Sequence, residues 1–238
     1  MPTPARRSPP QLARSSARVR VLSTTKRASY SEAAQILAAQ DPVLARLVED
    51  AGPMRLPRSR LSPFEALVQA IVYQQLAGAA ARAIHGRLVD AMNGEVIPDA
   101  LLALSDEQLR AVGLSAAKAR SLRDLAAKVL DGTVVVSPRR LARQSDEEVT
   151  RRLTTVRGIG PWSADMFLVF RLRRLDVWPV GDFGVRKGYG LAWKVPMPTA
   201  RELEPLGDRF RPYRTVVAWY CWRAVEIYAG AADSALTR

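Results

Sequence analysis

The chain contains 238 residues, which is enough to bury a sizeable core in one domain or in two closely joined lobes. Its 36 Lys and Arg residues against 23 Asp and Glu residues give a formal net charge of +13. This balance favours an anionic polymer or an acidic membrane surface as partner, although an arginine-rich genome would raise the count in the same way. The single cysteine and single histidine exclude an intrachain disulfide, a four-cysteine metal site and a histidine cluster.

The first segment, residues 1–28, is rich in Arg, Ser and Pro and poor in large apolar residues, which predicts a disordered basic arm. It lacks the apolar stretch of a secretory signal, and no uninterrupted apolar run in the chain reaches the length of a membrane span. We therefore expect a protein of the cytoplasm and bacterial nucleoid, or of a nucleus, that is not attached to a membrane.

Residues 29–238 carry a succession of helix signals, so we predict an all-α domain. Residues suited to capping precede apolar residues at helical spacing. The clearest case is Ser62-Pro63-Phe64-Glu65, a capping box with Pro in the first turn. The segments that we expect to be helical are 31–40, 42–52, from 63, 79–91, 98–103, 106–113, 115–132, 145–156, from 161, 183–193, from 199, and 212–228.

The most informative stretch is a predicted helical hairpin near residue 158. One helix runs into Val156, the turn Arg157-Gly158-Ile159-Gly160 follows, and a second helix begins at Pro161 or Trp162. Two glycines suit such a turn because each can adopt a positive φ without a Cβ clash. The turn amides and the new helix N-terminus then point outward together, which predicts a seat for one phosphate group.

A second, looser helix–turn–helix is predicted at Val-Gly-Leu-Ser, residues 112–115, with Lys118 on the following helix. It is either an ordinary helical connection or a second phosphate contact, and the residues themselves do not decide between these two interpretations.

Two motifs together indicate a family. Leu-x-x-Val-x-Gly-Ile-Gly-Pro-Trp at residues 153–162 is followed by Pro-x-x-Asp-x-Gly-x-Arg at residues 179–186. With residues 63–77 and Arg-Pro-Tyr-Arg at 211–214, they resemble the helix-hairpin-helix (HhH-GPD) DNA glycosylase superfamily, and within it the 3-methyladenine glycosylases of the AlkA and yeast Mag type. The resemblance covers roughly residues 30 to 230.

The resemblance implies a two-lobed helical fold. The middle lobe would comprise about residues 63–165, with the hairpin at its end, and the second lobe residues 29–62 plus 166–230. We expect the N-terminal β domain of AlkA to be absent, because residues 1–62 are predicted mostly as arm and helix.

The resemblance also implies that Asp182 is the catalytic carboxylate. Hydrolysis of an N-glycosidic bond passes through an oxocarbenium-like state, and a fixed carboxylate stabilises its positive charge and activates the attacking water. An N-alkylated purine is already cationic and leaves without a strong general acid. The alternative role of Asp182, N-cap of the helix that begins at Phe183, is compatible with catalysis.

The expected base pocket contains Trp162, Met166, Trp222 and Tyr73. Trp162 stands where bifunctional relatives have a nucleophilic lysine, so we expect no lyase activity. Its ring can stack on an extruded base and attract a cationic one. The resemblance places Trp222 in the pocket, and Met166 where AlkA has a tyrosine. The alternative for each of these side chains is ordinary core packing.

The DNA contacts implied by the resemblance lie in two loops. The hairpin residues Gly158, Ile159 and Gly160 would bind a phosphate. Gln75, or else Leu76, would be the wedge that fills the gap when a base leaves the stack. The alternative is that residues 74–77 simply link two helices.

The resemblance further implies a sodium or potassium ion between the phosphate and the backbone carbonyls of Thr154, Val156 and Ile159 when DNA is bound. We expect no other cofactor. An iron–sulphur cluster, which one branch of the superfamily carries, is excluded because Cys221 alone cannot ligate it.

Together these features predict a monomeric, monofunctional DNA glycosylase of base excision repair that acts on double-stranded DNA containing 3-methyladenine, 7-methylguanine and related alkylated bases. Two alternatives remain at this point. One is a glycosylase of the same fold for deaminated or oxidised bases, and the other is a non-enzymatic helix-hairpin-helix DNA-binding module. A carboxylate beside a base pocket would distinguish an enzyme from a binding module, which needs neither.

Overall fold

The computed structural model describes residues 28–235, and every regular element in that range is helical, with no strand. The all-α prediction is confirmed, whereas the predicted arm lies outside the described residues apart from Ala28. The elements are α1 (Tyr30–Gln40), α2 (Pro42–Ala51), α3 (Pro63–Tyr73), α4 (Gly78–Ala91), α5 (Pro98–Ala103), α6 (Asp106–Ala111), α7 (Ala116–Leu130), α8 (Pro138–Leu141), α9 (Asp146–Leu153), α10 (Pro161–Met166), η1 (Phe167–Arg171), α11 (Phe183–Trp193), α12 (Ala200–Leu206), η2 (Asp208–Phe210) and α13 (Arg214–Ala235).

Capping residues set most of the helix starts. The predicted capping box at Ser62 is present, with the side chains and backbone amides of Ser62 and Glu65 bonded reciprocally. The first helix begins earlier than expected, because Ser29 and Glu32 form a capping box and Ser31 lies inside the helix. At the other end α13 continues to Ala235, although its end was expected near residue 228. No helix among residues 28–235 combines the length and the apolar character needed to cross a bilayer.

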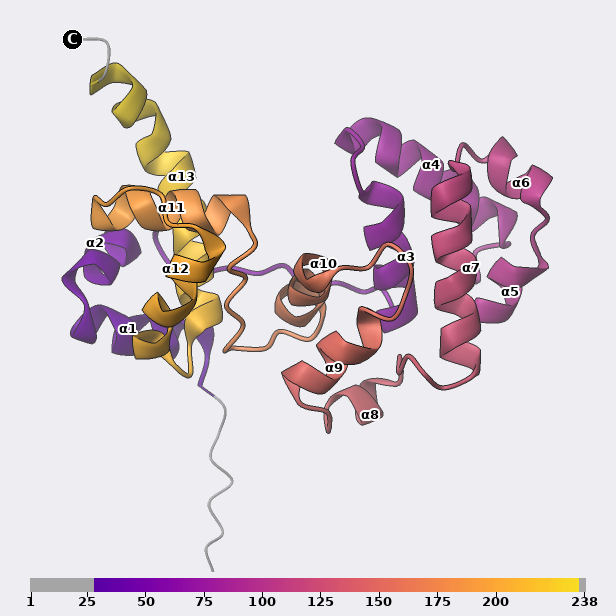
Figure 1. The fold of residues 1–238 in the computed structure, drawn as a ribbon, viewed down its shortest axis with the longest axis horizontal. Helices are drawn as coiled ribbons and strands as arrows, with labels where there is room; N and C mark the ends of the chain where they lie inside the picture. The colour runs from indigo at the N-terminus through magenta and orange to yellow at the C-terminus, as the bar shows by residue number, and fades with distance from the viewer. Residues whose placement is uncertain (1–27, 236–238) are drawn as a thin grey trace, which may run out of the picture.

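The helices form two lobes, each with its own core (Figure 1). The first core is built from buried residues between Phe64 and Val177, on α3 to α10 and η1. The second combines residues 33–54 with residues 178–224, on α1, α2, α11, η2, α12 and α13. The first core continues past residue 165 because α10 runs directly into η1, which packs on α3. Two connections, α2 to α3 and η1 to α11, join the lobes (Figure 1).

The second connection is anchored to the start of α13. Asp176 accepts hydrogen bonds from Arg214 at both carboxylate oxygens, from Nε at 2.8 Å and from a terminal nitrogen at 3.0 Å. The buried hydroxyl of Thr215 accepts from the Val177 N–H at 2.9 Å and donates to the Arg174 carbonyl at 2.8 Å. The Arg-Pro-Tyr-Arg motif at 211–214 therefore fixes the path of the chain toward residue 182.

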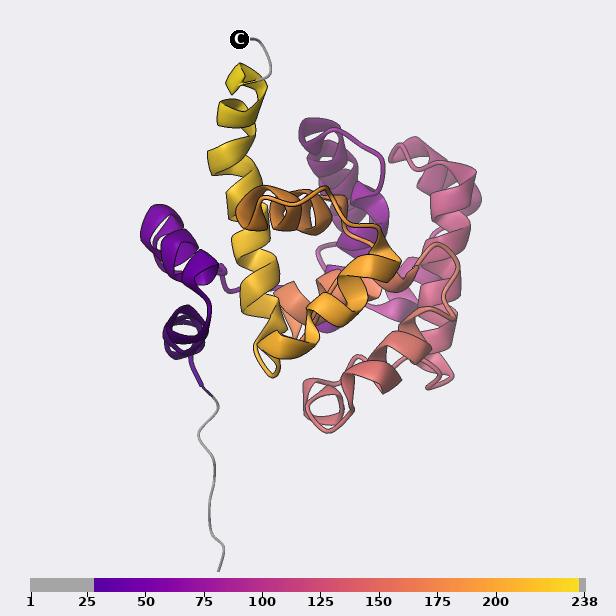
Figure 2. The same ribbon diagram turned by 60° about the vertical axis from the view of Figure 1, so that its left-hand side comes forward.

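The closest packing in the second lobe is the crossing of α11 and α13 (Figure 2). A Cβ atom added at Gly188 would lie 1.8 Å from the carbonyl oxygen of Cys221, so only glycine permits this approach. Burial in the same contact raises the pKa of the Cys221 thiol. Because α11 begins after Asp182 and α13 carries Trp222, this crossing fixes how close those two side chains lie.

The Gly188→Ala variant should lose about 3 kcal/mol or more of unfolding free energy, because the added methyl group collides with backbone and forces two packed helices apart. Gly86→Ala is the matched control. An added Cβ at Gly86, inside α4, meets no atom within 4 Å, and this variant should gain about 0.5 to 1 kcal/mol. Urea denaturation of both variants measures the difference, and equal stabilities would contradict the close crossing.

Candidate active site

The candidate site centres on Asp182, the buried N-cap of α11, which is 8% exposed. Its Oδ1 accepts a hydrogen bond from the Val185 N–H at 2.8 Å, so the capping role that the sequence allows is present. The same carboxylate accepts from two indoles, Trp162 Nε1 to Oδ2 at 2.6 Å and Trp222 Nε1 to Oδ1 at 2.9 Å. Trp162 belongs to the first lobe and Trp222 to the last helix. Asp182 is therefore held at the junction of the lobes by donors from both sides.

Trp222 is itself fixed from two directions. Its ring stacks on Phe170 of η1 at 5.6 Å between ring centres and 20° between planes. On the α11 side, a Cβ added at Gly184 would lie 2.8 Å from the Trp222 ring. The glycine of the Asp-x-Gly-x-Arg motif is thus required for the indole to reach Asp182.

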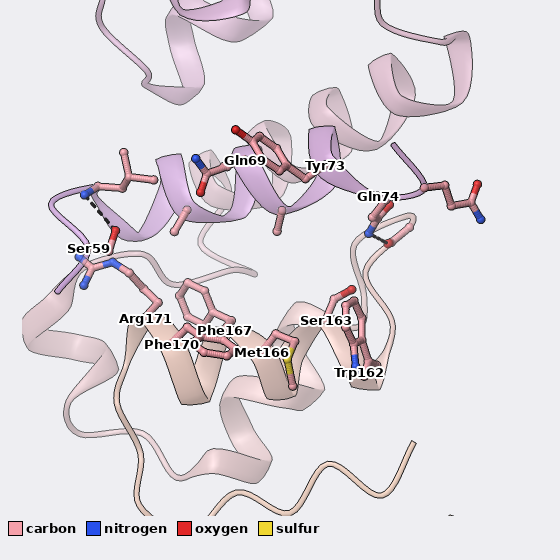
Figure 3. A pocket seen from close by; sticks show the side chains of 15 residues that line it. Ser59, Gln69, Tyr73, Gln74, Trp162, Ser163, Met166, Phe167, Phe170 and Arg171 are labelled. Atoms are coloured by element: carbon pink, nitrogen blue, oxygen red, sulfur yellow. Dashed lines mark hydrogen bonds between the residues drawn. The ribbon is translucent and has the colours of Figure 1, made fainter. Parts of the chain in front are cut away.

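A cavity of about 720 Å³ opens between α3 and the α10–η1 segment, a volume typical of small-ligand pockets (Figure 3). Its walls are mostly apolar or aromatic, and the exposed rings of Trp162 and Phe170 contribute to them. The lining residues are Ser59, Leu61, Ala66, Gln69, Ala70, Tyr73, Gln74, Gln75, Gly158, Trp162, Ser163, Met166, Phe167, Phe170 and Arg171.

Three of the four predicted pocket residues, Trp162, Met166 and Tyr73, line this cavity. Trp222 is not among the lining residues and meets the wall through its stack on Phe170. The sequence reasoning did not identify Phe170. Its position four residues after Met166, on the stripe that includes Trp162, was the available signal.

The helix that carries Phe170 is irregular. Residues 167–171 form a π-helical turn, in which the Leu172 N–H donates to the Phe167 carbonyl at 3.0 Å. Such turns hold an extra residue and are frequent at functional sites. The wider turn changes the direction of the side chains that follow it and contributes both Phe167 and Phe170 to the cavity wall.

A second carboxyl group lies close to the first. Asp165 is on α10, one turn after Trp162, and is not among the cavity residues. Burial and the nearby charge of Asp182 raise the pKa of Asp165 to about 7. The sequence did not single out this residue, because its environment depends on the packing of the two lobes.

The hairpin follows α9 as predicted, but its two glycines differ. Gly158 has φ +78°, and a Cβ there would stand 2.8 Å from the Ser121 hydroxyl. Gly160 has φ −96°, an ordinary value, and an added Cβ would meet no atom within 4 Å. Only Gly158 therefore uses the positive φ that glycine permits, and Gly160 forms the N-cap of α10. Ile159 between them is buried in the first core.

Several amides at the hairpin are unbonded. Among the described residues, the N–H groups of Gly158, Gly160, Trp162 and Ser163 donate no hydrogen bond, whereas the Arg157 N–H donates to Asp124 Oδ2 at 2.7 Å. Free amides at a helix N-terminus bind anions, because the helix dipole places partial positive charge there. The geometry suits one phosphate group.

The backbone carbonyls expected to hold a cation are available. Within residues 28–235, the carbonyls of Thr154 and Ile159 accept no hydrogen bond, and that of Val156 accepts one, from the Ile159 N–H at 3.1 Å. Neutral carbonyls fit a monovalent cation of low charge density. In the same range, no group of three or more His, Cys, Asp or Glu residues is arranged to hold a metal ion.

The predicted wedge loop lies beside the hairpin. Gln75 is exposed, with φ +56°, and Leu76 is 37% exposed. The preceding residue, Gln74, donates from Nε2 to the Gly158 carbonyl at 2.8 Å (Figure 3). Hairpin, loop and cavity therefore meet at one place on the surface.

Comparison with known proteins gives a family match. Residues 68–210 match the sequence model of the HhH-GPD superfamily, described as base excision DNA repair proteins. DNA-3-methyladenine glycosylase 1 of Schizosaccharomyces pombe is 34% identical over 204 residues, which cover 84% of this chain and 89% of that protein. The family match includes the hairpin and Asp182 and ends before Trp222.

Solved structures share the fold. The S. pombe 3-methyladenine DNA glycosylase in complex with abasic DNA superimposes with a TM-score of 0.71 at 34% identity, covering 82% of this chain and 96% of that one. A DNA-3-methyladenine glycosidase from Bacillus halodurans superimposes with a TM-score of 0.78 at 35% identity, covering 84% and 92%.

Gly158→Ala should weaken binding of damaged and undamaged duplexes to a similar extent, because the positive φ is lost, the methyl group meets Ser121, and phosphate contacts carry no sequence information. Gly160→Ala is the matched control and should retain the turn and most of the affinity. Fluorescence anisotropy with both duplexes measures the effect. Unchanged affinity of Gly158→Ala for both would show that the hairpin is only a structural turn.

Proposed function

Because the chain belongs to the HhH-GPD superfamily of base excision DNA repair proteins, we propose that it is a monofunctional DNA glycosylase that releases alkylated bases from duplex DNA. The observation that carries the proposal is the buried carboxylate of Asp182, which accepts hydrogen bonds from two indoles, one of them Trp162 of the aromatic cavity wall. A non-enzymatic binding module needs neither the cavity nor a buried carboxylate. The names of the relatives support 3-methyladenine and similar lesions as substrates.

DNA binding would begin with the phosphate backbone. The free amides of the hairpin receive one phosphate, and the net charge of +13 attracts the duplex over a longer range. A sodium or potassium ion at the carbonyls of Thr154, Val156 and Ile159 would add positive charge on the side facing that phosphate. Gln75 or Leu76 then fills the space that the extruded base leaves. The protein works as a monomer, since one chain supplies every group in this scheme.

The extruded base enters the cavity beside Trp162. An indole face attracts a cation through its quadrupole, so a positively charged alkylated purine binds there better than a neutral one. Met166 provides a flexible, polarizable contact without a hydrogen-bond pattern to read. Selection of the base then depends mainly on its charge and on how easily the damaged pair opens.

Bond cleavage would depend on the carboxylate oxygen of Asp182 that still has a lone pair available. Among the described residues, Oδ2 accepts one hydrogen bond, from Trp162, whereas Oδ1 accepts two. A carboxylate oxygen accepts about two hydrogen bonds, so Oδ2 has a lone pair available. As the C1′–N bond breaks and its electrons leave with the base, the carboxylate stabilises the positive sugar. Water adds to C1′, gives its proton to Oδ2, and leaves an abasic site.

Asp182→Asn should lower the single-turnover rate of base release by about two to three orders of magnitude, because the charge beside the sugar is lost. The new amide N–H also opposes the Trp162 N–H, so its melting temperature should fall modestly.

Asp41→Asn is the matched control for Asp182→Asn. Asp41 is likewise a buried N-cap aspartate that accepts from an indole, Trp193 Nε1 at 3.3 Å, but neither Asp41 nor Trp193 lines the cavity. Asp41→Asn should have a lower melting temperature and keep the wild-type single-turnover rate of base release. Near-wild-type base release by Asp182→Asn would overturn the mechanism.

The reaction should stop at the abasic site, because Trp162 stands at the hairpin position where a lyase needs an amine. Borohydride added during turnover should trap no covalent protein–DNA species, and strand breaks should appear only after alkali or an added endonuclease. Robust trapping would show that another amine, such as Lys187 on α11, reaches the sugar.

The preferred lesions should be cationic. In single-turnover reactions, 3-methyladenine and 7-methylguanine should be released faster than hypoxanthine and 8-oxoguanine, since only the first two leave as neutral bases from a charged nucleotide. Met166→Tyr should narrow the range by adding a rigid ring with a polar tip to the cavity wall. A preference for 8-oxoguanine over both methylated purines would favour the oxidised-base alternative instead.

A further inference from the structure

The loop between α3 and α4, residues 74–77, is held by a lysine from another helix. The last carbonyls of a helix have no hydrogen-bond partner within that helix. Here Lys118 of α7 donates from Nζ to the Val72 carbonyl at 2.6 Å and to the Gln74 carbonyl at 2.8 Å. A cation at this end of α3 is also favoured by the helix dipole. Lys118 makes no ion pair among the described residues, and burial lowers its pKa.

A side-chain hydrogen bond joins the same loop to the hairpin. Gln74, whose carbonyl binds Lys118, donates through its side-chain amide to the Gly158 carbonyl at 2.8 Å. The next residue, Gln75, has φ +56°, which costs free energy for a side chain with a Cβ. Such a conformation persists where the surroundings enforce it. Here the two hydrogen bonds of Gln74, to Lys118 and to Gly158, enforce it. The result is an exposed Gln75 in a fixed backbone conformation, two residues after the end of α3.

The helix that supplies Lys118 also supports the hairpin. Ser121, one turn further along α7, packs against Gly158. A Cβ atom added at Gly158 would lie 2.8 Å from the Ser121 hydroxyl. Asp124, another turn along, accepts from the Arg157 N–H at 2.7 Å and pairs with Lys128 at 2.9 Å. One face of α7 therefore carries the loop and the hairpin together.

We propose that Lys118 is a positioning residue that holds the loop 74–77 in a fixed position relative to the phosphate-binding hairpin. Gln75 then enters the DNA at the base step where the hairpin binds the backbone. The inference rests on the proposed function. It also assigns the looser helix–turn–helix at residues 112–118 a structural task, because its lysine amine donates to the carbonyls of Val72 in α3 and of Gln74 just after it. Without Lys118 the end of α3 frays and Gln75 fills the gap left by the extruded base less effectively, while the chemistry at Asp182 is unchanged.

The test compares one lesion in two contexts. Single-turnover release of 7-methylguanine is measured with the lesion paired to cytosine and with the lesion opposite an abasic analogue, where no pair has to open. Lys118→Met should slow release from the paired context by roughly ten- to a hundredfold, as expected for a misplaced positioning group, and from the unpaired context by less than about threefold. Equal slowing in both contexts would overturn the proposal, because it would indicate a general structural defect.

Three variants serve as comparisons. Arg120→Met removes the same charge from an exposed position of α7. It should keep the wild-type ratio of the release rate in the unpaired context to that in the paired context. Lys118→Arg restores a cationic donor and should recover part of the ratio. Gln74→Leu removes the side-chain hydrogen bond to Gly158 and also changes one cavity-lining side chain. The ratio between the two contexts should shift in the same direction as in Lys118→Met, so the proposal stays testable if that variant does not fold. A wild-type ratio in Gln74→Leu and in a folded Lys118→Met would overturn it.

A readout that does not depend on base release separates this inference from the proposed function. At saturating protein, wild type should raise the fluorescence of 2-aminopurine placed opposite an abasic analogue, because the wedge disturbs its stacking, and Lys118→Met should raise it less. If wild type raises the fluorescence more than Lys118→Met does but releases no base, the proposed function fails and the positioning role stands. If both proteins raise it equally, the positioning role fails.

Discussion

The arrangement of this molecule depends on one carboxylate that accepts hydrogen bonds from two indoles on separate lobes. Trp162 follows the hairpin of the first lobe and Trp222 lies on the last helix, so the position of Asp182 is defined relative to both cores. Glycines at 184 and 188 are required by the same constraint. Gly184 makes room for the Trp222 ring, and Gly188 lets α11 approach the backbone of α13. A larger residue at either position would move the carboxylate relative to the cavity.

The first lobe separates two tasks that a base-releasing enzyme has to coordinate. One face of α7 supports the loop at 74–77 and the hairpin, which are the two proposed DNA contacts. The α10–η1 segment begins at that hairpin and provides most of the aromatic wall of the cavity. Trp162 belongs to both systems, because it is in the first turn of α10 and also donates to Asp182. In the proposed mechanism, one short helix would thereby couple binding of the phosphate to placement of the sugar beside the carboxylate.

Much of the fold could be predicted because it is encoded locally. Capping residues such as Ser62 and Asp41 satisfy helix ends within a few residues of chain, and both act as expected. The features that could not be predicted depend on distant contacts. The π-helical turn that contributes Phe170 to the cavity has no residue signature, and the pKa of Asp165 is raised by burial and by the nearby charge of Asp182, both of which depend on tertiary packing. The residue type at position 160 permits a positive φ, but the observed turn does not use it. The roles of Asp182, the hairpin and the wedge loop stay predictions.

The central claim is that the site is built to stabilise positive charge on the sugar. Binding of duplexes that carry a cationic pyrrolidine analogue or a neutral tetrahydrofuran analogue of the abasic nucleotide tests it directly, because the two differ mainly in that charge. The account predicts that wild-type protein binds the pyrrolidine duplex at least about a hundredfold more tightly, as expected for a transition-state mimic. Equal affinity for the two duplexes at the same salt concentration would contradict it.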